Sequence, residues 1–250
     1  MVRFIDSALF AIVYPISLVG SVVAGFFVAR YLYYNKNIVW KASGIENGII
    51  GLFALLLSFT LLMSGNIQRE RTVMVHQFAD GVAQVERMTA LVPSSARDSI
   101  ADYLRQHLDL HINYYENKID RPDELVTALN RLNGNFWQHF PRQSDSSGHT
   151  LRMQLLPVYN QLNSSSYKLI YSYMERVPAL IIFLIIISSL LIGLLVGFMN
   201  GFHEKRHYLV PLIYVVIVSL MVQSIRDLDN PYAGSIRPKY DNLKDLRKLI

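Results

Sequence analysis

Residues 178–199 read PALIIFLIIISSLLIGLLVGFM, a run of twenty-two residues without a charged side chain. An α-helix rises 1.5 Å per residue, so this run spans about 33 Å, enough to cross the hydrocarbon core of a bilayer, which is about 30 Å thick. The run therefore predicts a transmembrane helix.

Three further uncharged segments have the same character, namely Ala8–Ala29, Asn47–Gln68 and Tyr208–Ser224, of which the last is the shortest. The alternative is a set of buried core helices, but soluble cores rarely contain four segments of this length. The chain is also apolar throughout, with 52% hydrophobic residues, 17% charged residues and a mean hydropathy of +0.24. We predict an all-α integral membrane protein with four transmembrane helices.

Charged residues gather between residues 66 and 176, which hold twelve Lys/Arg and twelve Asp/Glu. A formal charge of zero argues against a nucleic-acid-binding face. We predict transmembrane helices one and two in residues 1–65, a soluble helical domain in 66–176, helices three and four in 177–225 and a tail in 226–250. The chain has no cysteine, which excludes disulfides, thiolate metal sites and cysteine nucleophiles.

Four spans put both termini and the soluble domain on one side of the membrane. Within about fifteen residues of the span ends, that side has eight Lys/Arg and the opposite side five, and the positive-inside rule makes the richer side cytoplasmic. The eight are Arg3, Arg69, Arg71, Lys168, Arg176, Arg226, Arg237 and Lys239; the five are Arg30, Lys36, Lys41, Lys205 and Arg206.

The soluble domain has helical spacing throughout. An apolar stripe continues from span two through Val75, Phe78, Val82, Val85 and Val92, so span two is expected to run into the domain as one long helix that ends at Pro93. Further helices are predicted from Ser95, from Asp120 and from Leu151, the last kinked or restarted at Pro157. Alternating strand patterns of useful length are absent from the sequence.

Residues 203–207 read HEKRH and match the HExxH pattern, in which two histidines one helical turn apart bind zinc. The motif lies in the short turn between spans three and four, between Gly201 and Pro211, and no third ligand is evident. A basic interfacial turn is the favoured interpretation, and a zinc protease is the alternative.

His107 and His111 are also one helical turn apart, on the same predicted face as Leu104 and Leu108. We expect them to lie in a helix–helix interface and to hydrogen-bond to neighbours such as Tyr103 or Tyr114. A metal or proton-transfer role is the alternative.

Span two has a stripe at spacings of three and four residues that is apolar at its outer end and mildly polar toward the domain: Ile50, Phe53, Leu57, Thr60 and Ser64. Copies of this stripe around a symmetry axis would form a narrow hydrophobic pore that gates by wetting. Ordinary packing against other spans or lipid is the alternative, and periodicity alone favours it.

The tail directly after span four reads DLDNPYAGSI over residues 227–236. Asn-Pro and Ala-Gly are turn signals, and the two acids next to Arg226 indicate docking through ion pairs. The acids could instead gather a hard cation such as calcium, although two acids and an asparagine are few ligands for such a site.

This tail resembles the closing motif of the bestrophin-like family of bacterial membrane proteins, which is distantly related to the bestrophin anion channels. The matching positions are Asp227, Asp229, Asn230, Pro231 and Gly234. The stretch GLFALLLSF from Gly51, the Arg69/Arg71 pair, the Arg87-led helix and the Gly201–Arg206 turn resemble other parts of the family pattern. One departure is Phe78-Ala79, where the family has a glutamate–alanine pair.

The resemblance implies a homo-oligomer, pentameric in true bestrophins, in which the second helices line an apolar neck. It also implies an acidic clasp after the last span that binds calcium in animal members, but only Asp227 and Asp229 match its position here, so calcium control is not expected. We predict an ion channel or channel-like protein of the bacterial inner membrane, with copies of itself, lipid and small ions as partners. A membrane-anchored scaffold or sensor is the alternative. No catalytic residue, metal site or cofactor is predicted.

Overall fold

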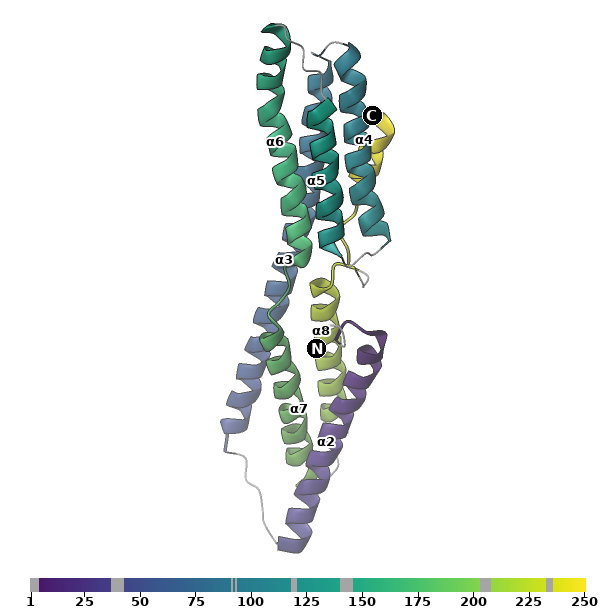
Figure 1. Ribbon diagram of the computed structural model, residues 1–250. Helices are drawn as coiled ribbons and strands as arrows, with labels where there is room; N and C mark the ends of the chain where they lie inside the picture. Colours follow the sequence, from purple (N-terminus) through teal and green to yellow (C-terminus); the bar gives the residue numbers. More distant parts are fainter. Residues whose placement is uncertain are drawn as a thin grey trace. The chain divides into compact units, whose positions relative to one another are not determined.

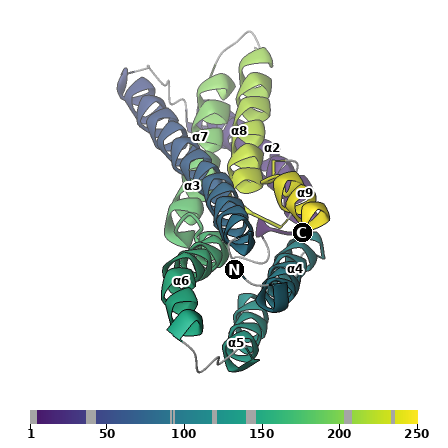
Figure 2. The ribbon, with the colours of Figure 1, turned by 90° about the horizontal axis from the view of Figure 1, so that it is seen from above.

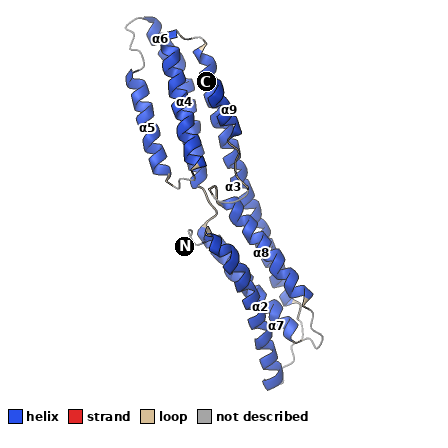
Figure 3. Ribbon diagram, turned by 90° about the vertical axis from the view of Figure 1, so that its right-hand side faces the viewer, coloured by secondary structure: helices blue, strands red, loops and turns tan. Residues whose placement is uncertain are grey.

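The computed structural model describes residues 5–36, 43–90, 92, 94–117, 121–139, 146–202, 208–232 and 236–250. Within these residues every regular element is an α-helix and there is no strand (Figure 3). The helices, labelled in Figure 1, are α2 (Ala8–Lys36), α3 (Ile45–Thr89), α4 (Ser94–Glu116), α5 (Pro122–His139), α6 (Ser146–Met174), α7 (Ala179–Gly201), α8 (Leu209–Asp229) and α9 (Asp241–Leu249).

The chain divides into two compact units. Unit 1 consists of Met1–Asn66 and Arg176–Asn230, and unit 2 of Ile67–Glu175 and Pro231–Ile250. The boundary in α3 falls inside a continuous helix, which agrees with the predicted long helix.

Four helical stretches in the described residues are long and apolar enough to cross a membrane: α2, α3, the stretch that contains α7, and α8. Only 17–22% of the residues in their most apolar segments are buried. Apolar side chains that point outward along helices of this length require lipid or another protein surface to cover them. This agrees with the predicted all-α fold with four membrane spans.

Unit 1 is organised by the close approach of α2 and α7. A Cβ atom on Gly25 would lie 2.0 Å from the carbonyl oxygen of Leu194, and one on Gly197 would lie 1.9 Å from that of Val22. Only glycine allows backbones this close, as is common between membrane helices. The buried apolar core of the unit is formed by Phe10, Tyr14, Leu18, Phe53, Leu57, Ile185, Ile192, Val218, Val222 and Ile225.

Unit 2 is a bundle in which α3, α4, α5 and α6 enclose a core rich in aromatic residues (Figures 1 and 2). The apolar stripe predicted on α3 lies in this core, with Val75, Phe78 and Val82 each almost fully buried. α6 begins at Ser146 and continues through Pro157, so of the predicted kink or restart at Pro157 the restart does not occur. Pro157 is on the exposed side of the helix, so the carbonyl group that its ring leaves unbonded is not forced into the core.

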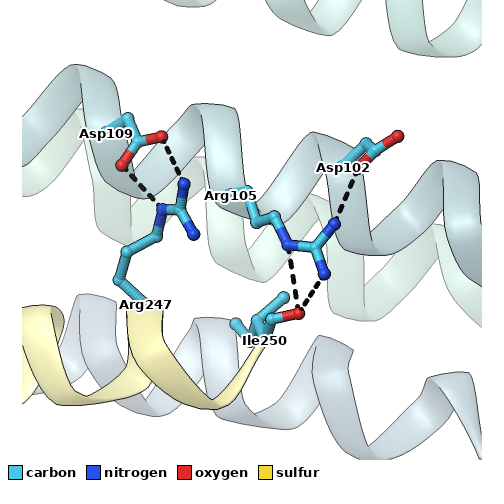
Figure 4. A network of polar contacts seen from close by, with 5 residues as sticks. All are labelled: Asp102, Arg105, Asp109, Arg247 and Ile250. Carbon is cyan, nitrogen blue, oxygen red and sulfur yellow. Dashed lines mark hydrogen bonds and ion pairs between the residues drawn. The ribbon is translucent and has the colours of Figure 1, made fainter.

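α9 lies along α4 and was not predicted from the sequence. Arg247 binds both carboxylate oxygens of Asp109, at 2.7 and 3.0 Å, and Arg105 donates to the backbone oxygen of Ile250 at 3.1 Å (Figure 4). Leu243, a residue of α9 itself, is fully buried. The segment after Pro231 is therefore part of unit 2 rather than a separate tail.

Candidate functional site

The stripe predicted to line a pore faces the interior of the chain in the structure. Phe53, Leu57, Thr60 and Ser64 are buried, and Ile50 is partly buried. Phe53 and Leu57 belong to the core of unit 1, and the Thr60 hydroxyl donates to the carbonyl oxygen of Leu56 in its own helix at 2.9 Å. In a single chain this stripe packs against the other helices of unit 1.

The stripe is one end of a longer buried face of α3. Gln68 and Arg71, both buried, continue its spacing of three and four residues into the core face of unit 2. We call this face the buried seam of α3: Phe53, Leu57, Thr60, Ser64, Gln68, Arg71, Val75, Phe78, Val82 and Val85. An unbroken pattern of this kind is typical of a helix that packs along its whole length.

The opposite side of the membrane half of α3 is exposed and apolar. Leu52, Leu55, Phe59 and Leu62 are each 62–70% exposed and recur at spacings of three and four residues. They share one face of the helix, which we call the outer face of α3. This face is available to lipid or to neighbouring copies without any change in the packing of the chain.

A cavity of about 320 Å³ lies at the start of α3, beside α7 and α8. Its lining is mostly apolar, with the two amide side chains Asn47 and Asn200 among Ile50, Val196, Met199, Val210 and Pro211. Ile50 of the predicted stripe thus borders open space in the single chain.

Arg71 connects α3 to the end of α6 in unit 2. Its guanidinium group is fully buried and donates to the carbonyl oxygens of Ser172 and Glu175 at 3.1 and 2.6 Å. The last carbonyl groups of a helix lack intrahelical partners and carry partial negative charge, so a buried cation is well matched to this position. Gln68 adds an acceptor at 3.4 Å.

The structure places the two tail acids differently, since Asp229 is buried and Asp227 is partly exposed. Asp229 is buried, and its carboxylate accepts a hydrogen bond from the backbone N–H of Val177 at 2.6 Å. Asp6 pairs with Arg176 at 2.7 Å, and its backbone oxygen accepts from Arg226 at 3.1 Å. Asn230 and Pro231 are buried, and Gly234 lies outside the described residues.

Asp6, Arg176 and Asp229 are among the residues that line a small cavity of about 40 Å³. The positive charge beside these aspartates belongs to the guanidinium group of Arg176. Within the described residues, no group of three or more His, Cys, Asp or Glu side chains could hold a metal ion.

Comparisons with known proteins place this geometry in a family. The model of the Bestrophin-like domain matches residues 47–242, which is most of the chain. The chain belongs to the Bestrophin-like family. No curated protein matches the sequence significantly.

The fold is also similar to the crystal structure of a mutated bacterial bestrophin homolog from Klebsiella pneumoniae, with a TM-score of 0.66. The match covers 95% of this chain and 96% of that one at 15% sequence identity. At this identity the likeness concerns the fold. The predicted resemblance to the bestrophin-like family is confirmed by the family match.

In this Bestrophin-like protein, His107 and His111 lie in the core of unit 2, both fully buried. His107 contacts the Tyr103 hydroxyl through Nδ1 at 3.1 Å, as predicted, whereas Tyr114 contacts Tyr232. The Nε2 atoms of both histidines contact the hydroxyl of Ser166, at 2.9 and 2.7 Å. The alternative HExxH zinc motif, His203–His207, lies outside the described residues.

Sequence reasoning missed Arg71, Asp6 and Ser166 as structural partners. The signal for Arg71 was present, since it continues the three-and-four spacing between Ser64 and Val75. Asp6 and Ser166 had no such signal, because each acts through residues far away in the sequence.

Proposed function

We propose that this Bestrophin-like membrane protein is an ion channel, formed by several copies of the chain around an axis with α3 of each copy along the passage. Family membership supports the proposal. The observation that carries it is the outer face of α3, a regular apolar surface on a membrane helix whose other side is already committed to packing.

The lining is assigned here to the outer face rather than to the stripe from Ile50 to Ser64. Four residues of that stripe are buried in the single chain, so they could border a passage only if the copies exchanged their internal packing. Leu55 and Phe59 need no such exchange. A ring of Phe59 side chains would form a narrow apolar constriction that passes ions only when it is wetted.

The proposed assembly lies in a bacterial inner membrane, with unit 2 and both termini in the cytoplasm, as the distribution of Lys and Arg predicts. The resemblance implies a homo-oligomer, which is pentameric in true bestrophins. Single-particle images of the purified protein in negative stain would count the copies directly.

The natural absence of cysteine permits a sharp test of the lining. Single-cysteine variants at Leu55 and Phe59 on the outer face, and at Phe53 and Leu57 on the buried seam, would be reconstituted in planar bilayers and exposed to a charged thiol reagent. We expect the reagent to change the current of the first pair and to leave the second pair unaffected.

The unmodified chain and a cysteine variant at exposed Glu86 in unit 2 serve as controls. Current changes confined to the buried-seam variants would mean that the predicted stripe from Ile50 to Ser64, and not the outer face, lines the passage. A bilayer that stays sealed at all voltages would refute the channel itself.

A further inference from the structure

The two buried histidines of unit 2 are linked to α6 by a single hydroxyl group. His107 and His111 project from α4 with their rings stacked 5.4 Å apart, and Phe78 of α3 packs against both. Ser166 of α6 meets an Nε2 atom of each ring. A serine hydroxyl has one proton, so it donates to one ring and accepts from the other.

The donor and the acceptor of each hydrogen bond in this series can be assigned from its Tyr103 end. The Tyr103 hydroxyl donates to Oδ1 of Asn133 at 2.8 Å, so it accepts from the N–H at Nδ1 of His107. Nε2 of neutral His107 is then an acceptor for the Ser166 O–H, and Ser166 accepts from the N–H at Nε2 of His111. The two histidines therefore hold opposite tautomers.

This assignment leaves one ring nitrogen without a hydrogen bond. Nδ1 of His111 becomes an unprotonated acceptor, and it is buried without a hydrogen-bond partner among the described residues. It is the nitrogen at which His111 would take up a second proton. The added N–H would lie in an apolar core with no acceptor, which is costly.

No charged side chain within the described residues bonds to either ring. The polar groups around the pair are Tyr103 and Tyr115 on α4 and Ser166 on α6, while α3 contributes the apolar Phe78. Around Tyr103 lie Tyr159 of α6 and Asn133 and Phe136 of α5. Around Tyr115 lie Tyr173 of α6 and Tyr240.

Beyond these groups, the cation Arg71 acts on Tyr173, which packs on Tyr115. Burial lowers the pKa of His107 to about 3, and burial together with His107 lowers the pKa of His111 well below its usual range.

We propose that His107, Ser166 and His111 form an acid-operated latch between α4 and α6, which holds while both rings are neutral and releases when either ring takes up a second proton. A histidine whose folded-state pKa is depressed stabilises the folded state above its unfolded pKa, and this stability is lost as the pH falls below about 6.5. The latch would make opening of unit 2 respond to cytoplasmic acidification.

Hydrogen exchange of α4 and α6 amides in the full-length protein in nanodiscs tests the latch. After correction for intrinsic exchange, lowering the pH from about 7.5 to about 5.5 should increase opening about tenfold per histidine, or about a hundredfold for the pair. His111→Phe should reduce the response to about tenfold. The control His76→Phe alters an exposed histidine of α3 that contacts Asn242 and should respond as the wild type does.

An acid response of His111→Phe equal to that of the wild type would overturn the proposal. Nitrogen-15 NMR of labelled histidine in the unsubstituted protein provides a second test that does not depend on how a variant folds. We expect the Nδ1–H tautomer for His107 and the Nε2–H tautomer for His111 at neutral pH. The same tautomer at both positions would also refute the latch.

Discussion

The carboxylate of Asp229, the last residue of α8, accepts a hydrogen bond from the backbone N–H of Val177 at 2.6 Å, and both residues are buried. The preceding residue, Arg176, is held by Asp6 at 2.7 Å. Two aspartates from distant parts of the sequence thus fix two consecutive residues just before α7. The tail motif of this Bestrophin-like protein has a structural task within the single chain.

Asp229→Ala should lower the stability of the protein by about 1.5–3 kcal/mol, since it removes a charge-assisted hydrogen bond to a buried N–H. Asp229→Asn keeps an acceptor and should cost less. Thermal unfolding in detergent measures both, with Glu86→Ala at an exposed position of α3 as the control. Equal midpoints for Asp229→Ala and the control would contradict the assigned role.

Arg71 and Arg69 form a natural matched pair, because Arg71 is fully buried and Arg69 is exposed. Arg71→Ala leaves the carbonyl groups of Ser172 and Glu175 without their buried donor and should cost at least about 3 kcal/mol. Arg69→Ala should change stability by less than about 0.5 kcal/mol. Chemical unfolding followed by tryptophan fluorescence compares them, and similar losses in both variants would refute the distinction.

Gly197→Ala should separate α2 from α7, because the added methyl group would lie 1.9 Å from the backbone oxygen of Val22. Backbone atoms on both sides leave no flexible side chain to move aside. Gly20→Ala is the control, since nothing lies within 4 Å of its Cβ position. We expect a lower melting temperature and a broadened size-exclusion peak for Gly197→Ala alone; a sharp, unshifted peak would contradict the close packing.

α9 should be held by its buried leucine more than by its ion pairs. The side chains of Arg247 and Asp109 are 37% and 45% exposed, so a double-mutant cycle should give a coupling below about 1 kcal/mol that shrinks in high salt. Leu243→Ala should release α9 and cost about 2–5 kcal/mol. Hydrogen exchange of α9 amides measures both effects. A coupling that is large and unaffected by salt would reverse this order.

The predicted orientation can be tested with a cysteine at Asp98, which is exposed on α4. A membrane-impermeant maleimide should label Asp98→Cys in inverted membrane vesicles and leave it unlabelled in intact spheroplasts. The unsubstituted chain has no cysteine and sets the background. Labelling in intact spheroplasts would place unit 2 outside the cytoplasm.

The helices were predictable because hydropathy and apolar spacing are local properties. The run from Pro178 and the stripe from Val75 to Val85 each indicate their own helix, and the structure has α7 and the core face of α3 at these positions. α9 was missed because nine residues with few apolar side chains are too short to form a stable helix without tertiary contacts. Its docking on Asp109 is visible only in three dimensions.

The site was less predictable, since periodicity shows that a helix has two faces and not what each face meets. Phe53 and Leu57 have the spacing of a pore stripe and equally that of a packing stripe. Reading on through Gln68 and Arg71 to Val75 would have favoured packing, because the pattern is continuous. The histidine partner Ser166 lies 55 residues from His111, beyond the reach of any sequence pattern.

α3 enters unit 2 as an unbroken helix, whereas the return from α6 to α7 passes through the non-helical residues Glu175–Pro178. Bending α3 would break helical hydrogen bonds, whereas two of the returning residues are held by side chains, Arg176 by Asp6 and Val177 by Asp229. A rotation of α3 about its own axis would therefore be transmitted along its full length. An unbroken helix of this kind can carry torque between its two ends.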